Sequence, residues 1–341
     1  AVLTPQEIDE LMQIMRNLVK EGKSVILITH KLAEIKAVAD RCTIIRRGKL
    51  IDVVDVSKTP VSQMASMMVG RPVSFKVEKK PAQVGRVILD IHNLTVLGNK
   101  KVPAVKDLSL FVRSGEIVGI AGVDGNGQSE LIEAITGLRP IDGGAVSLDG
   151  NDITNAPIRM RNEIGMGHIP EDRQRRGLVL STTVYNNVAI KEYYRPPFSK
   201  RGLLDIEYLQ EYARTVVDQF DVRSGEGIFS NAGKLSGGNQ QKLIVGREMV
   251  ANSQLLIAVQ PTRGLDVGAI EYIHSQLVAH RDKGHAVLLV SFELDEIFNL
   301  SDRIAVMHSG RIMDVVLPSE TDEATVGLMM TGIDAKGAGH E

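Results

Sequence analysis

Residues 116–138 read EIVGIA, GVDGNGQS and ELIEAITGL, which are an apolar run, a glycine-rich turn and an apolar-periodic run in succession. The first run predicts a buried strand and the last predicts a helix. Glycines relax the turn between them, so that its backbone N–H groups can converge on phosphate oxygens at the start of the helix. The predicted phosphate-binding loop consists of Gly122, Val123, Asp124, Gly125, Asn126, Gly127, Gln128 and Ser129.

The loop has the Walker A spacing, but its lysine position holds Gln128. An amide donates hydrogen bonds and carries no charge, so the loop lacks the positive charge that a lysine provides for the β- and γ-phosphates. We therefore expect nucleotide binding to survive here and hydrolysis to be lost. Taken alone, the loop also fits a glycine turn that never meets a nucleotide, and other motifs decide between the two interpretations.

Two later segments support the nucleotide interpretation. Residues 235–242 read LSGGNQQK and precede the apolar-periodic stretch 243–250, which places a Ser-Gly-Gly sequence at another helix start, where phosphate is the natural ligand. Residues 255–266 read LLIAVQPTRGLD, a buried strand that runs into a turn. The candidate nucleotide contacts of the first segment are Leu235, Ser236, Gly237, Gly238, Asn239 and Gln240.

The remaining pattern predicts an α/β fold. Short apolar runs at residues 24–29 and 286–291 predict strands that are covered on both faces in a parallel sheet. Alternating residues over 87–96 and 105–112 predict antiparallel strands. Residues 182–220 predict an inserted helical lobe. The predicted fold class is therefore a parallel-sheet core with an antiparallel β subdomain and an inserted helical subdomain.

An internal repeat sets the predicted domain organisation. Shifting residues 1–70 by 262 positions aligns them without a gap on residues 263–332, and 19 of the 70 pairs are identical. Such a register predicts the end of one domain followed by a complete copy. We expect the end of the first domain at residues 1–70, an exposed linker at 71–86, the second domain at 87–332 and a flexible tail at 333–341. Because the sequence opens without Met, we also expect a piece of a longer polypeptide.

Composition narrows the classes of function. With 40 Lys plus Arg against 42 Asp plus Glu, the net charge of −2 disfavours a general nucleic-acid binder. The longest apolar runs have about five residues, so a membrane role has to go through a partner. Cys42 is the single cysteine, which excludes an intrachain disulfide, and no signal segment is evident, so the cytosol is the expected compartment.

The order of these motifs resembles the nucleotide-binding domain of ATP-binding cassette (ABC) transporters. LSGGNQQK, QPTRGLD, the Walker A spacing and the repeat together resemble the two-domain subunits that energise importers of simple sugars and nucleosides. The resemblance implies a P-loop NTPase fold, ATP and Mg as cofactors, and a weak metal contact from Ser129. It also implies two membrane permease subunits, an extracellular substrate-binding lipoprotein and a place at the cytoplasmic face of the membrane.

The departures from the family pattern are concentrated in one site. Val259 and Gln260 stand where the family's Walker B strand ends in Asp-Glu, and Phe292 takes the slot of the switch histidine, whereas the repeat-equivalent position is His30. The resemblance therefore implies unequal sites. In the catalytic site, LSGGNQQK, His30 and Asp266 would complete the Walker motifs of a first domain. Asp266 by itself also fits a helix cap.

Residues 169–173 read IPEDR and resemble the loop that contacts the permease in the sugar and nucleoside importers. Glu171 takes the place of the family's glutamine, and Asp172 and Arg173 follow it. The arginine-rich run at 173–176 fits either a solvated surface or a docking surface. Residues 98–105 contain no aromatic side chain where the family often stacks adenine, so we do not expect base stacking there.

These observations predict that the complete protein is the ATP-hydrolysing subunit of an ABC importer for nucleosides or simple sugars. This chain alone is predicted to be inactive. One alternative is a soluble tandem-cassette ATPase that acts on ribosomes or DNA, which the near-neutral charge and the PEDR loop disfavour. Another is a regulatory module that binds nothing, which the intact LSGGNQQK disfavours.

Overall fold

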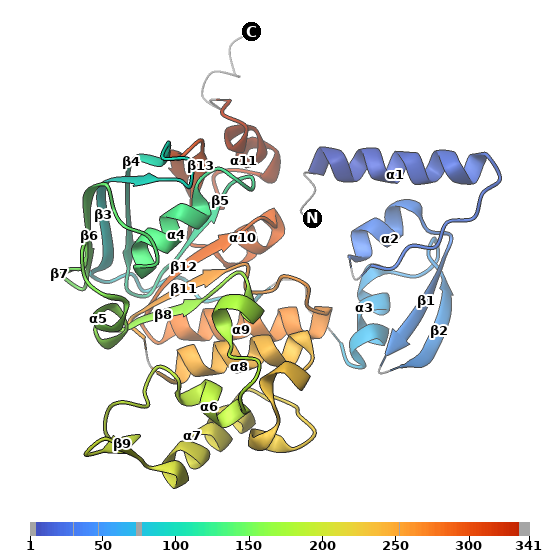
Figure 1. Ribbon diagram of the computed structural model, residues 1–341. Helices are drawn as coiled ribbons and strands as arrows, with labels where there is room; N and C mark the ends of the chain where they lie inside the picture. The colour runs from blue at the N-terminus through green and yellow to red at the C-terminus, as the bar shows by residue number, and fades with distance from the viewer. Residues whose placement is uncertain (1–4, 30, 47, 73–76, 252, 334–341) are drawn as a thin grey trace. The chain divides into compact units, whose positions relative to one another are not determined.

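The chain forms two compact units in a computed structural model. One unit comprises Ala1–Val77 with Leu265–Tyr272, and the other comprises Glu78–Gly264 with Ile273–Glu341 (Figure 1). The structure describes residues 5–29, 31–46, 48–72, 77–251 and 253–333. Within these ranges, no helix has the length and apolar character that crossing a bilayer requires.

The first unit is built from helices around one two-stranded hairpin. Its small core gathers side chains from every element except the first helix, among them Ile35, Ile44, Val54 and Met64. The C-terminal end of its last helix is capped by Gly70 in the left-handed conformation, which glycine adopts without strain. The elements are α1 (Pro5–Lys20), α2 (Leu32–Val38), β1 (Arg41–Arg46), β2 (Lys49–Asp55) and α3 (Val61–Val69).

The strand predicted at residues 24–29 is wrong. The described structure gives these residues no strand, and Ile26 and Ile28 are 92% and 94% exposed. A parallel strand exists only when a neighbouring strand accepts and donates its backbone hydrogen bonds. No described strand pairs with this segment, so its apolar pattern has nothing to be buried against.

The repeat found in the sequence is reproduced by the backbone. Helices α1 and α2 correspond to α9 (Val267–Asp282) and α10 (Leu294–Leu300), each shifted by 262 residues. The strand pair β1–β2 corresponds to β13 (Arg303–His308) and β14 (Arg311–Val316), and α3 corresponds to α11 (Glu323–Met330). Both hairpins even carry a register shift at the same place, between Ile44 and Ile45 and between Val306 and Met307.

The second unit is organised around a mostly parallel sheet of six described strands, in the order β14-β13-β5-β12-β11-β8. All neighbours run parallel except the edge pair β13–β14, and every residue of the three central strands is buried. The predicted strand at 286–291 is confirmed as β12. The other strands of the sheet not yet bounded are β5 (Ile117–Ala121), β8 (Met166–Ile169) and β11 (Leu255–Val259).

The predicted antiparallel strands form a sheet, and this sheet covers the first helix of the unit. Helix α4 (Gln128–Thr136) contacts β3 (Val87–Leu97) and β4 (Pro103–Arg113), and its Leu131 and Ile135 share one core with both sheets. The sheet is completed by β6 (Gly143–Leu148) and β7 (Asn151–Asp152). This arrangement fixes the end of α4 that follows the glycine-rich turn.

The predicted lobe at 182–220 is helical with a small hairpin inside it. Helices α6 and α7 contact each other, and both contact α8 (Figure 1). The lobe contains α6 (Val184–Ala189), β9 (Ser199–Lys200), β10 (Leu203–Leu204) and α7 (Ile206–Gln219), and the neighbouring helices are α5 (Ile158–Glu163) and α8 (Gly237–Val250).

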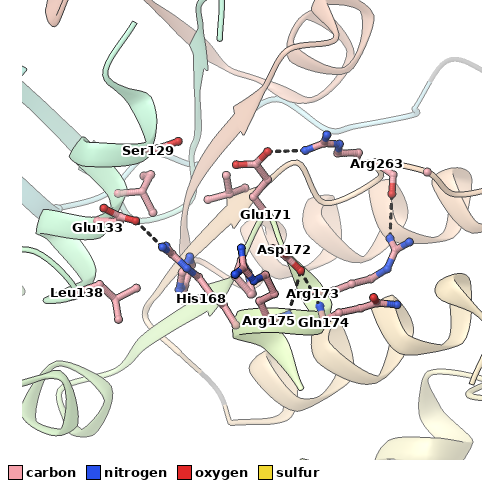
Figure 2. A pocket seen from close by; sticks show the side chains of 15 residues that line it. Ser129, Glu133, Leu138, His168, Glu171, Asp172, Arg173, Gln174, Arg175 and Arg263 are labelled. Carbon is pink, nitrogen blue, oxygen red and sulfur yellow. Dashed lines mark hydrogen bonds and ion pairs between the residues drawn. The ribbon is translucent and has the colours of Figure 1, made fainter. Parts of the chain in front are cut away.

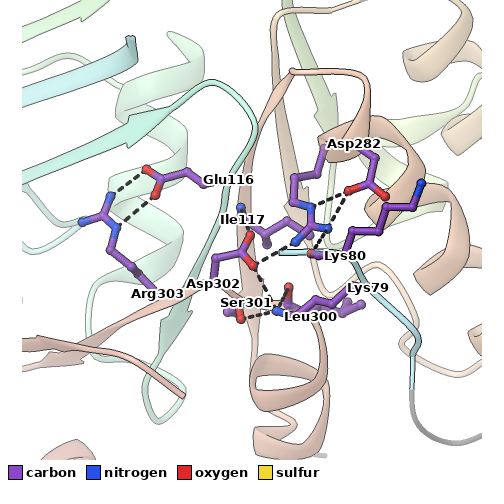
Figure 3. Close-up of polar contacts among 10 residues, drawn as sticks. Lys79, Lys80, Glu116, Ile117, Asp282, Leu300, Ser301, Asp302 and Arg303 are labelled. Carbon is purple, nitrogen blue, oxygen red and sulfur yellow. Dashed lines mark hydrogen bonds and ion pairs between the residues drawn. The ribbon is translucent and has the colours of Figure 1, made fainter. Parts of the chain in front are cut away.

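A cluster of ion pairs fastens residues 79–80 to the base of the six-stranded sheet (Figure 3). The Nζ of Lys79 donates to the carbonyl of Ser301 and lies 3.2 Å from Oδ1 of Asp302. Arg281, whose side chain is fully buried, binds the same carboxylate at 2.9 Å and the carbonyl of Lys80 at 2.8 Å. The other oxygen of Asp302 accepts the N–H of Ile117 at the start of β5. The segment before β3 is therefore anchored to the sheet.

Candidate functional site

The glycine-rich turn has the backbone of a phosphate-binding loop. It leaves the end of β5 and leads into α4, and Gly125 and Gly127 have φ values of 85° and 101°, which glycine adopts without strain. A Cβ on Gly127 would lie 2.3 Å from the carbonyl oxygen of Ala104, so no larger residue fits there. The free N–H groups at the start of α4 can therefore be approached closely by an anion.

Gln128 closes this loop on itself. Its side chain is 4% exposed, and its Nε2 donates to the carbonyl of Val123 at 3.1 Å. Asn126 ties the loop to the β13–β14 turn, because its Oδ1 accepts the N–H of Ser309 and its carbonyl accepts that of Gly310. The loop is thus held in place by neutral groups, with no cation inside it among the residues that the structure describes.

The end of β11 carries no carboxylate. Val259 is its last residue, and Gln260 follows with φ at 48° and a side chain that is 6% exposed. Its backbone N–H donates to the carbonyl of Val290, but its Nε2 has no hydrogen-bond partner among the described residues. An amide nitrogen is a donor only, so this position can contribute a hydrogen bond to a ligand and cannot accept a proton.

The signature segment lies at the start of a helix, as predicted. Ser236 is the N-cap of α8, and its Oγ accepts from Asn239 Nδ2 at 2.9 Å. Gln240 is buried and donates to the carbonyl of Ala232. A Cβ at Gly237 would lie 2.8 Å from Nη2 of Arg173, so the start of α8 lies against the arginine of the PEDR loop. Leu235 is buried, and Gly237 and Gly238 form the first turn.

A cavity of about 940 Å³ joins several predicted site residues (Figure 2). Ser129 lines it from α4, Val259 from β11, and Glu171, Asp172 and Arg173 from the loop after β8. The signature residues 235–240 and the loop residues 122–128 do not line it. The structure thus brings the metal candidate Ser129, the end of β11 and the PEDR loop together.

Polar contacts hold the walls of this cavity. Glu171 pairs with Arg263 at 2.5 Å, and the carbonyl of Arg263 accepts a hydrogen bond from Arg173 (Figure 2). Asp172 caps the short π-helical turn at Arg173–Gly177, because its Oδ1 accepts the N–H groups of Gln174 and Arg175. The PEDR loop is therefore linked to the turn after β11.

Asp266, a predicted catalytic residue, does not line this cavity. Asp266 belongs to the first unit, where its Oδ1 accepts the N–H of Ala269 and so caps α9. His30 lies outside the described residues. Phe292, which the sequence predicts in the slot of a switch histidine, follows β12 and is half-buried.

A buried charge cluster behind the cavity escaped prediction. Glu248 on α8 accepts from Lys191 at 2.6 Å, from Arg247 at 2.9 Å and from the backbone N–H of His168. Burial by itself would raise the pKa of Glu248, but the two cations outweigh it, so the pKa falls to about 2. Burial, and then the charge of Lys191, lowers the pKa of His168 to about 4. The sequence signal was the charged pair Arg247-Glu248 inside an otherwise apolar helix segment.

These features define a P-loop nucleotide-binding domain. Residues 105–263 match the family model described as "ABC transporter". The chain is 56% identical over 332 residues to the nucleoside import ATP-binding protein NupA of Lactococcus lactis subsp. cremoris, covering 97% of this chain and 65% of that protein. It is 56% identical over 339 residues to the guanosine import ATP-binding protein NupO of Bacillus subtilis, covering 99% and 66%. Residues 105–263 therefore carry the ABC transporter domain, and the relatives NupA and NupO, which this chain resembles, are import ATP-binding proteins.

Solved structures support the fold independently. A nucleotide-free ATP-binding cassette from an ABC transporter superposes with a TM-score of 0.57 at 25% identity, covering 67% of this chain and 91% of that one. A cassette in a post-hydrolysis state with ADP and phosphate superposes with a TM-score of 0.59 at 21% identity, covering 68% and 99%. The predicted fold class is confirmed. The chain spans about two thirds of the length of NupA and NupO.

Proposed function

We propose that this chain is the larger part of an ATP-binding subunit that drives the import of nucleosides. The observation that carries the proposal is the 56% identity, over nearly the whole chain, to a nucleoside and a guanosine import ATP-binding protein. A sugar is the second candidate cargo, because a glucose import protein of Haloferax volcanii is 43% identical. ATP hydrolysis would power uptake through two permease subunits at the cytoplasmic face of the membrane, supplied by an extracellular substrate-binding lipoprotein.

The two ATP sites of the complete subunit would be unequal. Gln128, Val259 and Gln260 put neutral groups where charge balance and proton acceptance are needed, and Phe292 replaces the switch histidine. The site that begins at residues 122–129 would bind ATP and hold it without cutting it. We propose that residues 1–70 end the first cassette, 71–86 link the two, 87–332 form the second and 333–341 form a tail.

The intact signature would serve the other site. Ser236 and the first turn of α8 would face the phosphates of ATP held by the first cassette, with His30 and Asp266 completing that site. The capping hydroxyl and the free N–H groups of α8 support this role, because a helix start attracts phosphate. This chain alone would then hydrolyse ATP negligibly, since it would lack half of the catalytic site.

Magnesium fits the degenerate site poorly. The hydroxyl of Ser129 lines the cavity, but β11 ends without a carboxylate, and Glu171 is engaged by Arg263. No group of three or more His, Cys, Asp or Glu side chains among the described residues could hold a metal. Mg²⁺ prefers carboxylates together with substrate phosphates, so we assign no step at this site to it.

The decisive experiment uses the complete subunit reconstituted with its permeases. Ser236→Ala is expected to lower the ATPase rate by about 100-fold or more, because a preorganised donor to a transferring phosphate is lost. Ser319→Ala, an exposed serine of the same unit, is the matched control and should keep the rate. Normal turnover by Ser236→Ala would refute the shared catalytic site. Uptake of radiolabelled guanosine against ribose would identify the cargo.

A further inference from the structure

The cavity beside Ser129 has an excess of arginine side chains. Arg173, Arg175 and Arg176 line it from the loop after β8, and Arg263 lines it from the turn after β11. Three carboxylates, those of Glu133, Glu171 and Asp172, share the wall. Four cations against three anions leave one positive charge in surplus, in a concave space that begins where the phosphate-binding loop ends.

Each carboxylate on this wall already has partners of its own. Glu133 lies 2.7 Å from Arg176 and 2.8 Å from Arg139, and Glu171 lies 2.5 Å from Arg263. Asp172 accepts two backbone N–H groups. The acids therefore do not present free negative charge to an entering anion.

Arg173 and Arg175 both lack a carboxylate partner among the described residues, but the guanidinium of Arg173 donates to the carbonyl of Arg263, which leaves Arg175. Its backbone N–H is bound by Asp172, but its guanidinium has no ion pair among the described residues, and the side chain is exposed. Arg263 is also available, because its pair with Glu171 is about half exposed to water and such pairs exchange at small cost. A guanidinium binds phosphate with two parallel hydrogen bonds and also carries a positive charge, whereas a glutamine amide is neutral.

We infer that Arg175 and Arg263 bind the terminal phosphates of a polyphosphate ligand held at the degenerate loop, and so supply the positive charge that Gln128 does not. The inference rests on the proposed function in one respect, which is that Gln128 occupies the lysine position of a phosphate-binding loop. The ligand class is a nucleoside triphosphate, whose phosphates would extend from the start of α4 past Ser129 into the cavity. Arg263 can keep its Nη1 on Glu171 and offer its other guanidinium N–H groups to the phosphate, whereas Arg175 needs to break no ion pair.

The test measures binding to this chain by titration calorimetry, with ATP and with inorganic tripolyphosphate. Arg175→Ala and Arg263→Ala are each expected to weaken the binding of both ligands by about tenfold, because a charge-assisted contact is lost. Arg159→Ala is the matched control, since Arg159 is an exposed arginine of the same unit that pairs with Glu163 and does not line the cavity. It should bind as the unchanged chain does.

A variant that restores the positive charge distinguishes phosphate binding by Arg175 from a role of Arg175 in holding the fold. Adding Gln128→Lys to Arg175→Ala should recover most of the lost affinity, because the positive charge returns from the loop side. Arginine variants that bind both ligands as tightly as the unchanged chain would overturn the inference, and so would an unchanged chain that binds neither. If instead Arg175→Ala impairs only assembly with the permeases, the arginines form a docking surface. None of these results alters the Ser236 experiment, which judges the proposed function separately.

Discussion

At the scale of single residues, the glycine-rich loop depends on backbone geometry more than on side chains. Gly125 and Gly127 both have positive φ, but a Cβ would meet nothing within 4 Å at Gly125 and the Ala104 carbonyl at Gly127. The sequence could predict this loop because the spacing of its glycines marks positions where the backbone adopts positive φ or is approached closely. It could not predict that Gln128 would turn back to the Val123 carbonyl, because that contact depends on the folded loop.

The two glycines therefore form a matched pair for a stability test. Gly127→Ala should lower the free energy of unfolding by about 3 kcal/mol or more, because strain at positive φ and a backbone collision add together. Gly125→Ala should cost only about 1 kcal/mol, for φ alone. Urea unfolding followed by circular dichroism measures both, and equal losses would contradict the collision at Gly127.

His280 provides a residue-scale prediction of pH dependence. Burial, and then the charges of His285 and Lys283, lowers the pKa of His280 to about 3. Between pH 6.5 and 3, His280 therefore binds a proton in the unfolded chain but not in the folded chain, so the free energy of unfolding falls as the pH falls. The loss from this one group is about 1.4 kcal/mol per pH unit at most.

Replacing His280 by Phe should flatten this dependence. Compared with the unchanged chain, His280→Phe should lose about 2 kcal/mol less between pH 6.5 and pH 4.5. Urea midpoints at the two pH values give the comparison. Curves that run parallel for the two proteins would show that His280 does not stay neutral in the folded state.

At the scale of elements, α8 is held near both ends by the loop that follows β8. Near its start, Gly237 lies against Arg173. Near its end, Arg247 donates to the carbonyl of Gly177, and Glu248 accepts from His168 on β8. Sequence periodicity predicted a helix here with Ser236 at its start. The cluster around Glu248 joins segments that are 57 and 80 residues apart, and no local pattern reports on such contacts.

Glu248→Gln tests how much this cluster holds the element together. The substitution leaves the buried Arg247 and the partly buried Lys191 without their counter-charge, which should lower the free energy of unfolding by about 3 kcal/mol. Glu163→Gln removes an exposed helix pair with Arg159 and should cost less than about 0.5 kcal/mol. Thermal unfolding measures both, and a small loss at Glu248 would mean that the cluster contributes little.

At the scale of the whole molecule, the repeat allows a comparison within one chain. Residues 286–291 and 24–29 have the same apolar pattern, but the first are buried between β5 and β11 and the second have no strand beside them. The sequence predicted both as strands because an apolar run shows only that a segment is suited to a buried position in a sheet. Whether a sheet is present depends on other parts of the polypeptide.

The exposed segment should make this chain associate with itself. Backbone that pairs with no strand among the described residues, next to exposed Ile26 and Ile28, is a template for strand pairing between molecules. Ile26→Lys with Ile28→Lys should shift the chain toward monomers in size-exclusion chromatography with light scattering, without loss of folded structure. Leu288→Lys, at the buried repeat position, should instead unfold the chain. Unchanged association of the double variant would contradict this expectation.

The attachment of α8 to the loop at 171–177 has a mechanical consequence. Fourteen helical residues form a stiff rod about 20 Å long. Because one loop contacts α8 near both ends, the helix and the loop should move together as a rigid body. A displacement of that loop would therefore move Ser236 as well, so substitutions in the loop should alter the position of the signature segment even where they leave the helix itself intact.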